Sequence, residues 1–390
     1  MQSTLRGYLM QFAHILQISL LERLEPEVGP LNDKARLLVA VVGMLRLSQY
    51  VGGARGWRGR PSKDRHALAT AFLAKAVYGL ETTRQVRDRL KTDRQLLCLC
   101  GWRHAGQIPH ESTFSRAFAD FAAGELPQRL HEALVRETQQ GRLIGHIARD
   151  STAIEARERY PENPPAKRQK KRYKMGPKPK RNMPASPRSN IEAQRRMQTS
   201  EVIAELPRHC SLGVKKSSKG YQQYWRGYKL HLDVADGHIP ITALLTGACV
   251  HDSQVAVPLM NITSERVTYL YDLMDAGYDA NAIRAHSLAL GHRPLIELTR
   301  RHRVIRERVP IRKDSRGKKT VYRCEPIYRE LTWAEQDRLR ERTTVERVYS
   351  RLKDEFGGRS IRVRGASKIM AHLMFGVLAL TVDQLLKLTG

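Results

Sequence analysis

The fold is decided by the stretch Arg342-Thr343-Thr344-Val345-Glu346-Arg347-Val348-Tyr349-Ser350-Arg351-Leu352-Lys353. We expect this stretch to form a helix, because Thr343 or Thr344 can cap its N-terminus by accepting from free amides of the first turn. Neither glycine nor proline follows before Gly357, where the helix is expected to end.

This helix would carry two neighbouring stripes of different character. At about 100° per residue, Arg342, Glu346 and Lys353 fall within roughly 40° of one another. A separate apolar stripe, made by Val345, Val348 and Leu352, is expected to pack against the core. The charged stripe has two interpretations. Arg342 and Glu346 form either a surface ion pair worth about 0.2–0.5 kcal/mol or part of a functional site.

Composition favours a nucleic-acid partner. The 390 residues carry a formal net charge of +29 with 41% hydrophobic residues, which predicts a sizeable core and a polyanionic ligand. An anionic membrane is the competing partner, but the apolar run 37–45 is too short to span a bilayer, so we expect no membrane partner. The N-terminus lacks a signal-peptide pattern, and the five scattered cysteines suit a reducing cytoplasm.

Residues 1–140 are expected to form a helical DNA-binding region. Short basic helices separated by turns fit either a helix-turn-helix-like DNA reader or a helical bundle with basic faces, and the sequence leaves both open. A basic insertion at about 157–200 is expected to be disordered until it contacts a phosphate backbone. Its expected DNA contacts are Lys167, Arg168, Lys170, Lys171 and Arg172.

From residue 141 to 390 the pattern predicts one α/β domain, a mixed sheet with helices on both faces. Apolar or alternating runs predict strands, and helical spacing predicts the elements between them. Asp236-Gly237 is typical of a hairpin turn. The expected strands are 143–150, 228–234, 239–246, 267–275 and 294–298, and the expected helices are 251–260, 280–290 and 370–388, besides the helix at 342–353.

Three acids stand where such a sheet places its ligands. Asp150 and Asp275 each end an expected strand, and Glu346 lies on the later helix. Asp272, inside the same strand as Asp275, is the alternative second acid. Carboxylates brought together repel one another unless cations intervene, and Mg²⁺ prefers such oxygen ligands. Two ions roughly 4 Å apart could activate an attacking oxygen and stabilise a leaving one in phosphoryl transfer.

Three motifs also carry a resemblance to a known family. Ile147–Thr152 surrounds the first aspartate, Met274–Asp279 surrounds the second, and Arg342, Glu346 and Lys353 have the spacing of a Tyr-Arg-Glu-Lys signature. In this order they resemble the DDE transposases of bacterial insertion sequences, in the cut-and-paste branch with a ribonuclease-H-like catalytic domain. Leu339 stands where the tyrosine of that signature belongs. The resemblance covers residues 143–388.

The resemblance implies a DNA transposase that binds terminal inverted repeats, cleaves DNA and transfers strands. Asp150, Asp275 and Glu346 would be catalytic residues and ligands of two Mg²⁺ ions, with Mn²⁺ as the alternative metal. Arg342, Arg347 and Lys353 would hold DNA phosphates. A homodimer or larger assembly on paired ends, associated with the bacterial nucleoid, is expected. A non-catalytic DNA-binding protein and a metal-dependent nuclease without strand transfer are the alternatives.

Overall fold

The structure is a computed structural model that describes residues 28–51, 63–158, 190–216, 221–298, 304–313, 320–328 and 331–388, together with Pro26. For the strands at 304–313 and 320–328 it describes the backbone alone. The five basic residues between 167 and 172 lie outside these ranges.

The N-terminal part is helical, as expected from the sequence. Asn32, Asp64, Thr82 and Asp93 begin helices by accepting hydrogen bonds from amides of the first turn. The helices are α3 (Asp33–Leu45), α4 (Arg65–Val77), α5 (Thr83–Thr92), α6 (Arg94–Leu99), α7 (Glu111–Ala123) and α8 (Leu126–Gln139), with short 3-10 turns η2 (Leu47–Gln49) and η3 (Ala105–Gln107).

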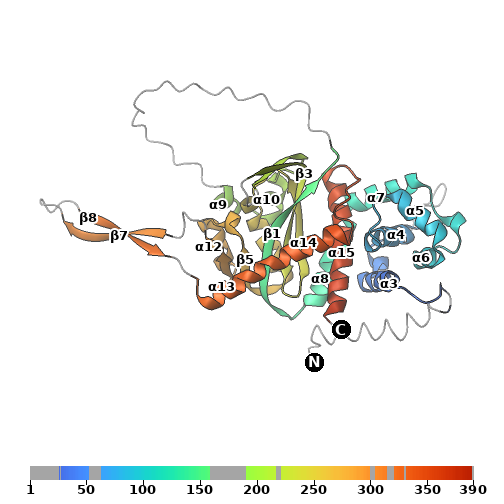
Figure 1. The fold of residues 1–390 in the computed structure, drawn as a ribbon, viewed down its shortest axis with the longest axis horizontal. Coiled ribbons are helices and arrows are strands. Elements are labelled where there is room, and N and C mark those ends of the chain that lie inside the picture. Colours follow the sequence, from blue (N-terminus) through green and yellow to red (C-terminus); the bar gives the residue numbers. More distant parts are fainter. Residues whose placement is uncertain are drawn as a thin grey trace, which may run out of the picture.

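A mixed sheet forms the centre of the second part (Figure 1). Its antiparallel members are β1 (Leu143–Glu155), β2 (Ser211–Lys216), β3 (Gln222–Ala235) and β4 (Ile239–Gly247), and its parallel additions are β5 (Thr268–Met274) and β6 (Arg293–Ile296). The strands follow the order β2-β3-β1-β5-β6, and β4 also pairs with β3. The expected α/β class is therefore confirmed.

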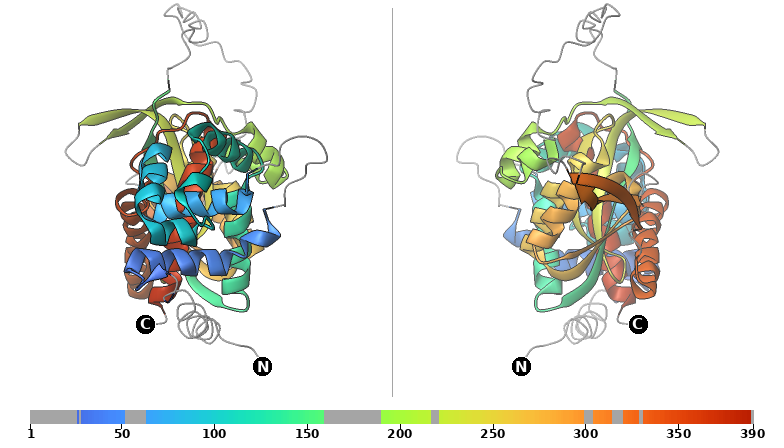
Figure 2. Two further views of the ribbon diagram at one scale, coloured as in Figure 1. Left: turned by 90° about the vertical axis from the view of Figure 1, so that its right-hand side faces the viewer. Right: turned by 90° about the vertical axis from the view of Figure 1, so that its left-hand side faces the viewer.

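The expected hairpin between β3 and β4 is present. Gly237 has a φ of 77°, in the left-handed region that glycine enters without strain, and it completes the turn after Asp236. Beyond the sheet body, β2 and the first half of β3 form a ribbon that projects from the molecule (Figure 2).

Helices lie against both faces of the sheet. Alternate residues of β1 point to opposite sides, so Arg149 faces α11 (Ala256–Arg266) and α12 (Asn281–Ala289), and Thr152 faces α14 (Thr344–Asp354). The connecting elements are α9 (Asn190–Gln194), α10 (Thr199–Glu205), the 3-10 turns η4 (Asp252–Gln254), η5 (Ala276–Tyr278) and η6 (Glu341–Thr343), α13 (Trp333–Arg340), and the hairpin β7 (Val304–Lys313) with β8 (Thr320–Tyr328).

The C-terminal helix α15 (Ala366–Lys387) joins the two parts (Figure 1). It packs against α3, α4, α7 and α8 on one side and against β4 on the other, so one apolar core runs through both parts. Among the described residues, α15 alone has the length and hydropathy of a membrane span, but 78% of that span is buried inside the fold.

Two predictions about element boundaries are wrong. The helical run before Glu346 begins at Trp333, because Thr332 and Glu335 form a capping box there, and neither Thr343 nor Thr344 caps α14 with its side chain. The basic insertion was expected to reach about residue 200, but α9 begins at residue 190, and α10 and β2 follow it; β2 is a strand because it pairs with the first half of β3.

Candidate active site between strands β1 and β5

Asp150 and Asp275 lie side by side at the edge where β5 ends. The parallel pairing of β1 with β5 runs to Arg149, which lies opposite Met274. The residue that follows Arg149 is Asp150, and the residue that follows Met274 is Asp275. Neighbouring strands are about 4.8 Å apart, which brings the two carboxylates close together. The sequence predicted that Asp150 ends its strand. This is wrong, because β1 continues to Glu155 along β3.

Both carboxyls have raised pKa values. Burial raises the pKa of Asp150 to about 7, and the charges of Asp275 and Asp252 add to this rise. Burial also raises the pKa of Asp275, again with Asp252 contributing. Main-chain amides oppose the effect: Ser151 N–H donates to Asp150 Oδ1 over 2.7 Å, and Gly277 N–H donates to Asp275 Oδ1 over 2.9 Å. The site therefore holds excess negative charge in a partly dehydrated place.

Asp252 is a third acid of this site, and sequence reasoning assigned it no role there. It opens η4, which packs against η5, the turn that follows Asp275. Its Oδ1 accepts from Ser151 Oγ over 2.8 Å and from Lys229 Nζ over 3.0 Å. Burial alone would raise the pKa of Asp252, but His231, Lys229 and the Ser151 hydroxyl together hold it below its ordinary value. Asp252 thus carries a stable negative charge.

Glu346 is on the expected helix, but its carboxylate does not join the two aspartates. It is 54% exposed and pairs with Arg342 through Nη1 and Oε1, 3.3 Å apart. In the part of the chain that the structure describes, no three acid, histidine or cysteine side chains form a group able to hold a metal ion. Arg342 itself lowers the pKa of both Asp150 and Asp275, so its guanidinium lies near them.

Two basic residues of α14 were expected to hold DNA phosphates, and they differ in their surroundings. Arg347 is exposed, with Nη1 3.4 Å from His238 Nε2. Lys353 is half-buried and donates from Nζ to Thr152 Oγ1 over 2.7 Å, two residues beyond Asp150 on β1. Burial lowers the pKa of Lys353, and Arg359 and Lys215 add to this effect. Lys353 therefore stands against β1 and does not extend freely into solvent.

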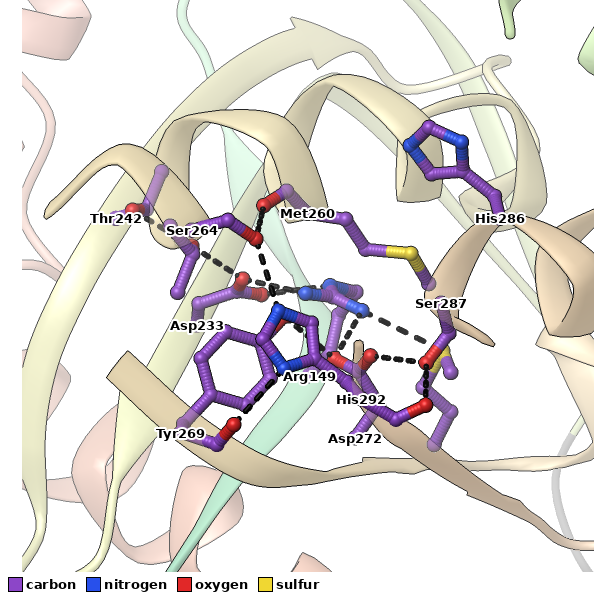
Figure 3. A network of polar contacts seen from close by, with 12 residues as sticks. Arg149, Asp233, Thr242, Met260, Ser264, Tyr269, Asp272, His286, Ser287 and His292 are labelled. Atoms are coloured by element: carbon purple, nitrogen blue, oxygen red, sulfur yellow. Dashed lines mark hydrogen bonds and ion pairs between the residues drawn. The ribbon is translucent and has the colours of Figure 1, made fainter. Parts of the chain in front are cut away.

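Asp272 is not part of the site. It is fully buried on the opposite face of the sheet, where its Oδ1 lies 3.1 Å from Arg149 Nη1 and its Oδ2 accepts from Ser287 Oγ over 2.6 Å (Figure 3). Arg149 also pairs with Asp233 over 2.6 Å. Two buried carboxylates around one guanidinium form a structural network. The geometry thus favours Asp275 as the second acid.

The same network bears on Asp150 through its neighbour in the chain. Arg149 precedes Asp150, and its side chain joins β1 to β3 through Asp233 and to β5 through Asp272 (Figure 3). Thr263 of α11 donates to Asp233 over 2.6 Å, which connects that helix as well. Strand β1 is therefore tied to both neighbours one residue before the acid.

Comparison with known families agrees with this geometry. The profile of the transposase DDE domain matches residues 142–382, which include Asp150, Asp275 and Glu346. A second profile, the transposase domain DUF772, matches residues 22–120 in the helical part. None of the curated proteins compared with the chain matches it. Transposase domains imply DNA as the substrate and an enzyme of the polynucleotidyl-transferase type. With more than half of its length matched, the chain belongs to the transposase DDE domain family.

Proposed function

We propose that the chain is the transposase of a bacterial insertion sequence, which cleaves DNA at the inverted-repeat ends of the element and joins the freed 3′ ends to a target. The observation that carries this proposal is the position of Asp150 and Asp275, which directly follow the last register pair, Arg149 with Met274, of two adjacent parallel strands. The mixed sheet supports the ribonuclease-H-like fold that the sequence resemblance implies, because antiparallel strands β4, β3 and β1 are followed by parallel β5 and β6.

The site's donor set suits a divalent cation. Asp150 and Asp275 are two carboxylates whose pKa values are raised by burial and by nearby negative charge, so a cation beside them offsets that charge. Mg²⁺ usually takes one or two carboxylates and completes its shell with water and phosphate, and Mn²⁺ accepts similar oxygen ligands. Two ions bound there would supply Lewis-acid activation of an attacking oxygen and stabilisation of a leaving one. Glu346 would be the third ligand once its carboxylate leaves Arg342.

Basic residues of η6 and α14 then position DNA. Arg342 presents a planar guanidinium near both aspartates, which suits bidentate binding of a phosphate. Arg347 is exposed one residue after Glu346 and can contact a neighbouring phosphate. Lys353 lies about 10 Å along the helix axis from Glu346, which suits a phosphate one or two nucleotides from the scissile bond.

The rest of the chain would supply DNA affinity. A net charge of +29 and the basic stretch at 167–172 favour binding to the phosphates of DNA, whatever its base sequence. The helical part before residue 140 would recognise the inverted repeats. We further propose that two copies act together on paired ends in the bacterial nucleoid, because both ends of an element must be processed.

An oligonucleotide assay tests this function. The protein is incubated with Mg²⁺ and a duplex that carries the inverted repeat flanking its gene, together with a target plasmid. We expect cleavage at the repeat end and a joined product. Asp150→Asn and Asp275→Asn should bind the duplex and leave it uncut, whereas Asp337→Asn, an equal charge change at an exposed side chain of α13, should cleave normally. Cleavage without joining would indicate a nuclease, and binding without cleavage would indicate a non-catalytic DNA-binding protein.

A further inference from the structure

The hydroxyl of Tyr349 lies at the seam between β1 and β3. It accepts a hydrogen bond from Leu232 N–H over 3.0 Å. Its own proton can go to the carbonyl oxygen of Asp150, 2.6 Å away, or to that of Leu230, 3.0 Å away. Asp150 and Leu232 are register partners in the antiparallel ladder. One side chain of α14 therefore links the main chains of two strands at the residue that carries the first acid.

This contact differs in kind from the apolar contacts of α14 with the sheet, and it adds to another directional contact, the hydrogen bond from Lys353 Nζ to Thr152 Oγ1 of β1. Val345, Val348 and Leu352 are buried there and stabilise the helix through apolar contact. Such contact is non-directional and does not by itself fix how far a helix slides or turns on a sheet. Hydrogen bonds weaken steeply with distance and angle. The Tyr349 hydroxyl thus supplies the directional contact that the apolar stripe lacks.

Burial keeps this contact intact. Tyr349 is 5% exposed, and Leu232 and Leu230 are fully buried, so water does not compete for the groups involved. A buried N–H left without a partner costs about 1–3 kcal/mol, which makes the arrangement costly to break.

The position of Tyr349 along α14 relates it to three residues with proposed roles, Glu346 and Lys353 on the same helix and Arg342 in the preceding turn η6. At 1.5 Å per residue it lies about 4.5 Å from Glu346 and about 6 Å from Lys353 along the axis. Arg342 lies two turns before it. A shift of one residue would move these side chains by about 1.5 Å and rotate them by about 100°. The anchor on the carbonyl of Asp150 therefore bears on the distance between the first acid and each of these residues, and it is the anchor that contacts the first acid itself.

We propose that Tyr349 is the positioning residue that fixes the catalytic helix α14 against Asp150, and so brings Glu346 within reach of the Asp150–Asp275 pair. This inference rests on the proposed function. Tyr349 faces the main chain of the sheet and its hydroxyl is buried, so its role is exerted through Asp150 and α14 and not through contact with DNA.

Tyr349→Phe tests the inference, because it removes the hydroxyl and keeps the ring. Misplacement by about 1 Å can cost about 10²-fold in rate. We therefore expect single-turnover cleavage of a pre-bound end to fall about 10²-fold, with the Kd for DNA unchanged. Tyr269→Phe is the matched control, since it also removes one buried hydroxyl, which bonds Asp272 over 3.2 Å on the far face of the sheet. This variant should lose similar stability and keep its cleavage rate.

A second measurement does not depend on activity. Amide hydrogen exchange of α14 and of Leu232 should accelerate at least about tenfold in Tyr349→Phe and stay unchanged at both places in Tyr269→Phe. Wild-type cleavage rates together with unchanged exchange in Tyr349→Phe would overturn the positioning role. If the wild-type protein cleaves no DNA, the proposed function fails, and hydrogen exchange alone still decides whether Tyr349 anchors α14.

Discussion

Replacing Asp150 by asparagine should stabilise the metal-free protein at the same time as it abolishes cleavage. Burial, more than any other effect, raises the pKa of this carboxyl from 3.8 to about 7. A rise of about three pKa units makes the charged form less stable in the folded state by up to about 4 kcal/mol. Asparagine removes that charge and keeps an oxygen that can accept from Ser151 N–H, which lies 2.7 Å from Oδ1 in the wild type.

The gain should depend on pH with a defined sign. The pKa of Asp150 is higher in the folded state than in the unfolded state, so the folded state binds more protons between about pH 4 and pH 7. The favourable contribution of the protonated Asp150 carboxyl to wild-type stability is fully present below the pKa of the unfolded state. It is lost as the pH rises through 7, where the buried carboxyl becomes charged. The advantage of Asp150→Asn is therefore smallest below about pH 4, grows as the pH rises from 4 to 7, and is largest above pH 7.

Urea denaturation in the presence of a chelator measures this difference at pH 5, 6, 7 and 8. Asp252→Asn is the matched control, because Lys229 and the Ser151 hydroxyl help to hold the pKa of Asp252 below its ordinary value. Asp252→Asn should therefore destabilise the protein at neutral pH. An Asp150→Asn variant that is less stable than wild type at pH 8, or whose advantage is the same at every pH, would refute the reasoning.

The remaining predictions concern the second acid, Lys353 and the basic insertion. Asp275→Asn should abolish cleavage and leave the protein stable. Asp272→Asn should lower the free energy of unfolding, measured by urea denaturation, by about 3–5 kcal/mol, because it leaves Arg149 short of one partner. An active Asp275→Asn variant together with a stable but inactive Asp272→Asn variant would reverse the assignment. Lys353→Ala should slow single-turnover cleavage by about one to three orders of magnitude. The affinity of the DNA-free protein for divalent ions, measured by calorimetry, should stay unchanged. Normal cleavage by this variant would exclude the proposed role of Lys353. Changing the five basic residues at 167–172 to serine should flatten the salt dependence of DNA binding by about 0.9 in the log–log slope per lost phosphate contact, so an unchanged slope would exclude phosphate contacts there.

Local patterns in the sequence predicted much of the fold around the site. The spacing of Val345, Val348 and Leu352 predicted the face of α14 that packs, and all three are buried. Two apolar runs that each precede an acid predicted that Asp150 and Asp275 would meet at one edge of the sheet, and their strands are adjacent and parallel. Such predictions work because period and turn chemistry act within a few residues.

What the sequence did not reveal depends on contacts between distant residues. Asp252 joins the site through Ser151 and Lys229, and Tyr349 bonds the main chain of Asp150, 199 positions earlier. Neither contact leaves a spacing signal. The capping box at Thr332 was detectable, since a threonine followed three residues later by glutamate is a local pattern.

The two halves of the site are held by contacts of different stiffness. Asp150 and Asp275 directly follow the last pair of a hydrogen-bonded parallel ladder, and the Arg149 network ties the same strands together one residue earlier. Glu346 is carried by a helix, and its carboxylate is exposed and bound to Arg342. An exposed pair of this kind is worth only about 0.3–0.5 kcal/mol, so a DNA phosphate that binds Arg342 can replace Glu346 at small cost. Under the proposed function, the freed carboxylate would then turn toward the aspartates on a helix that Tyr349 would keep in register, which would couple assembly of the site to the arrival of its substrate.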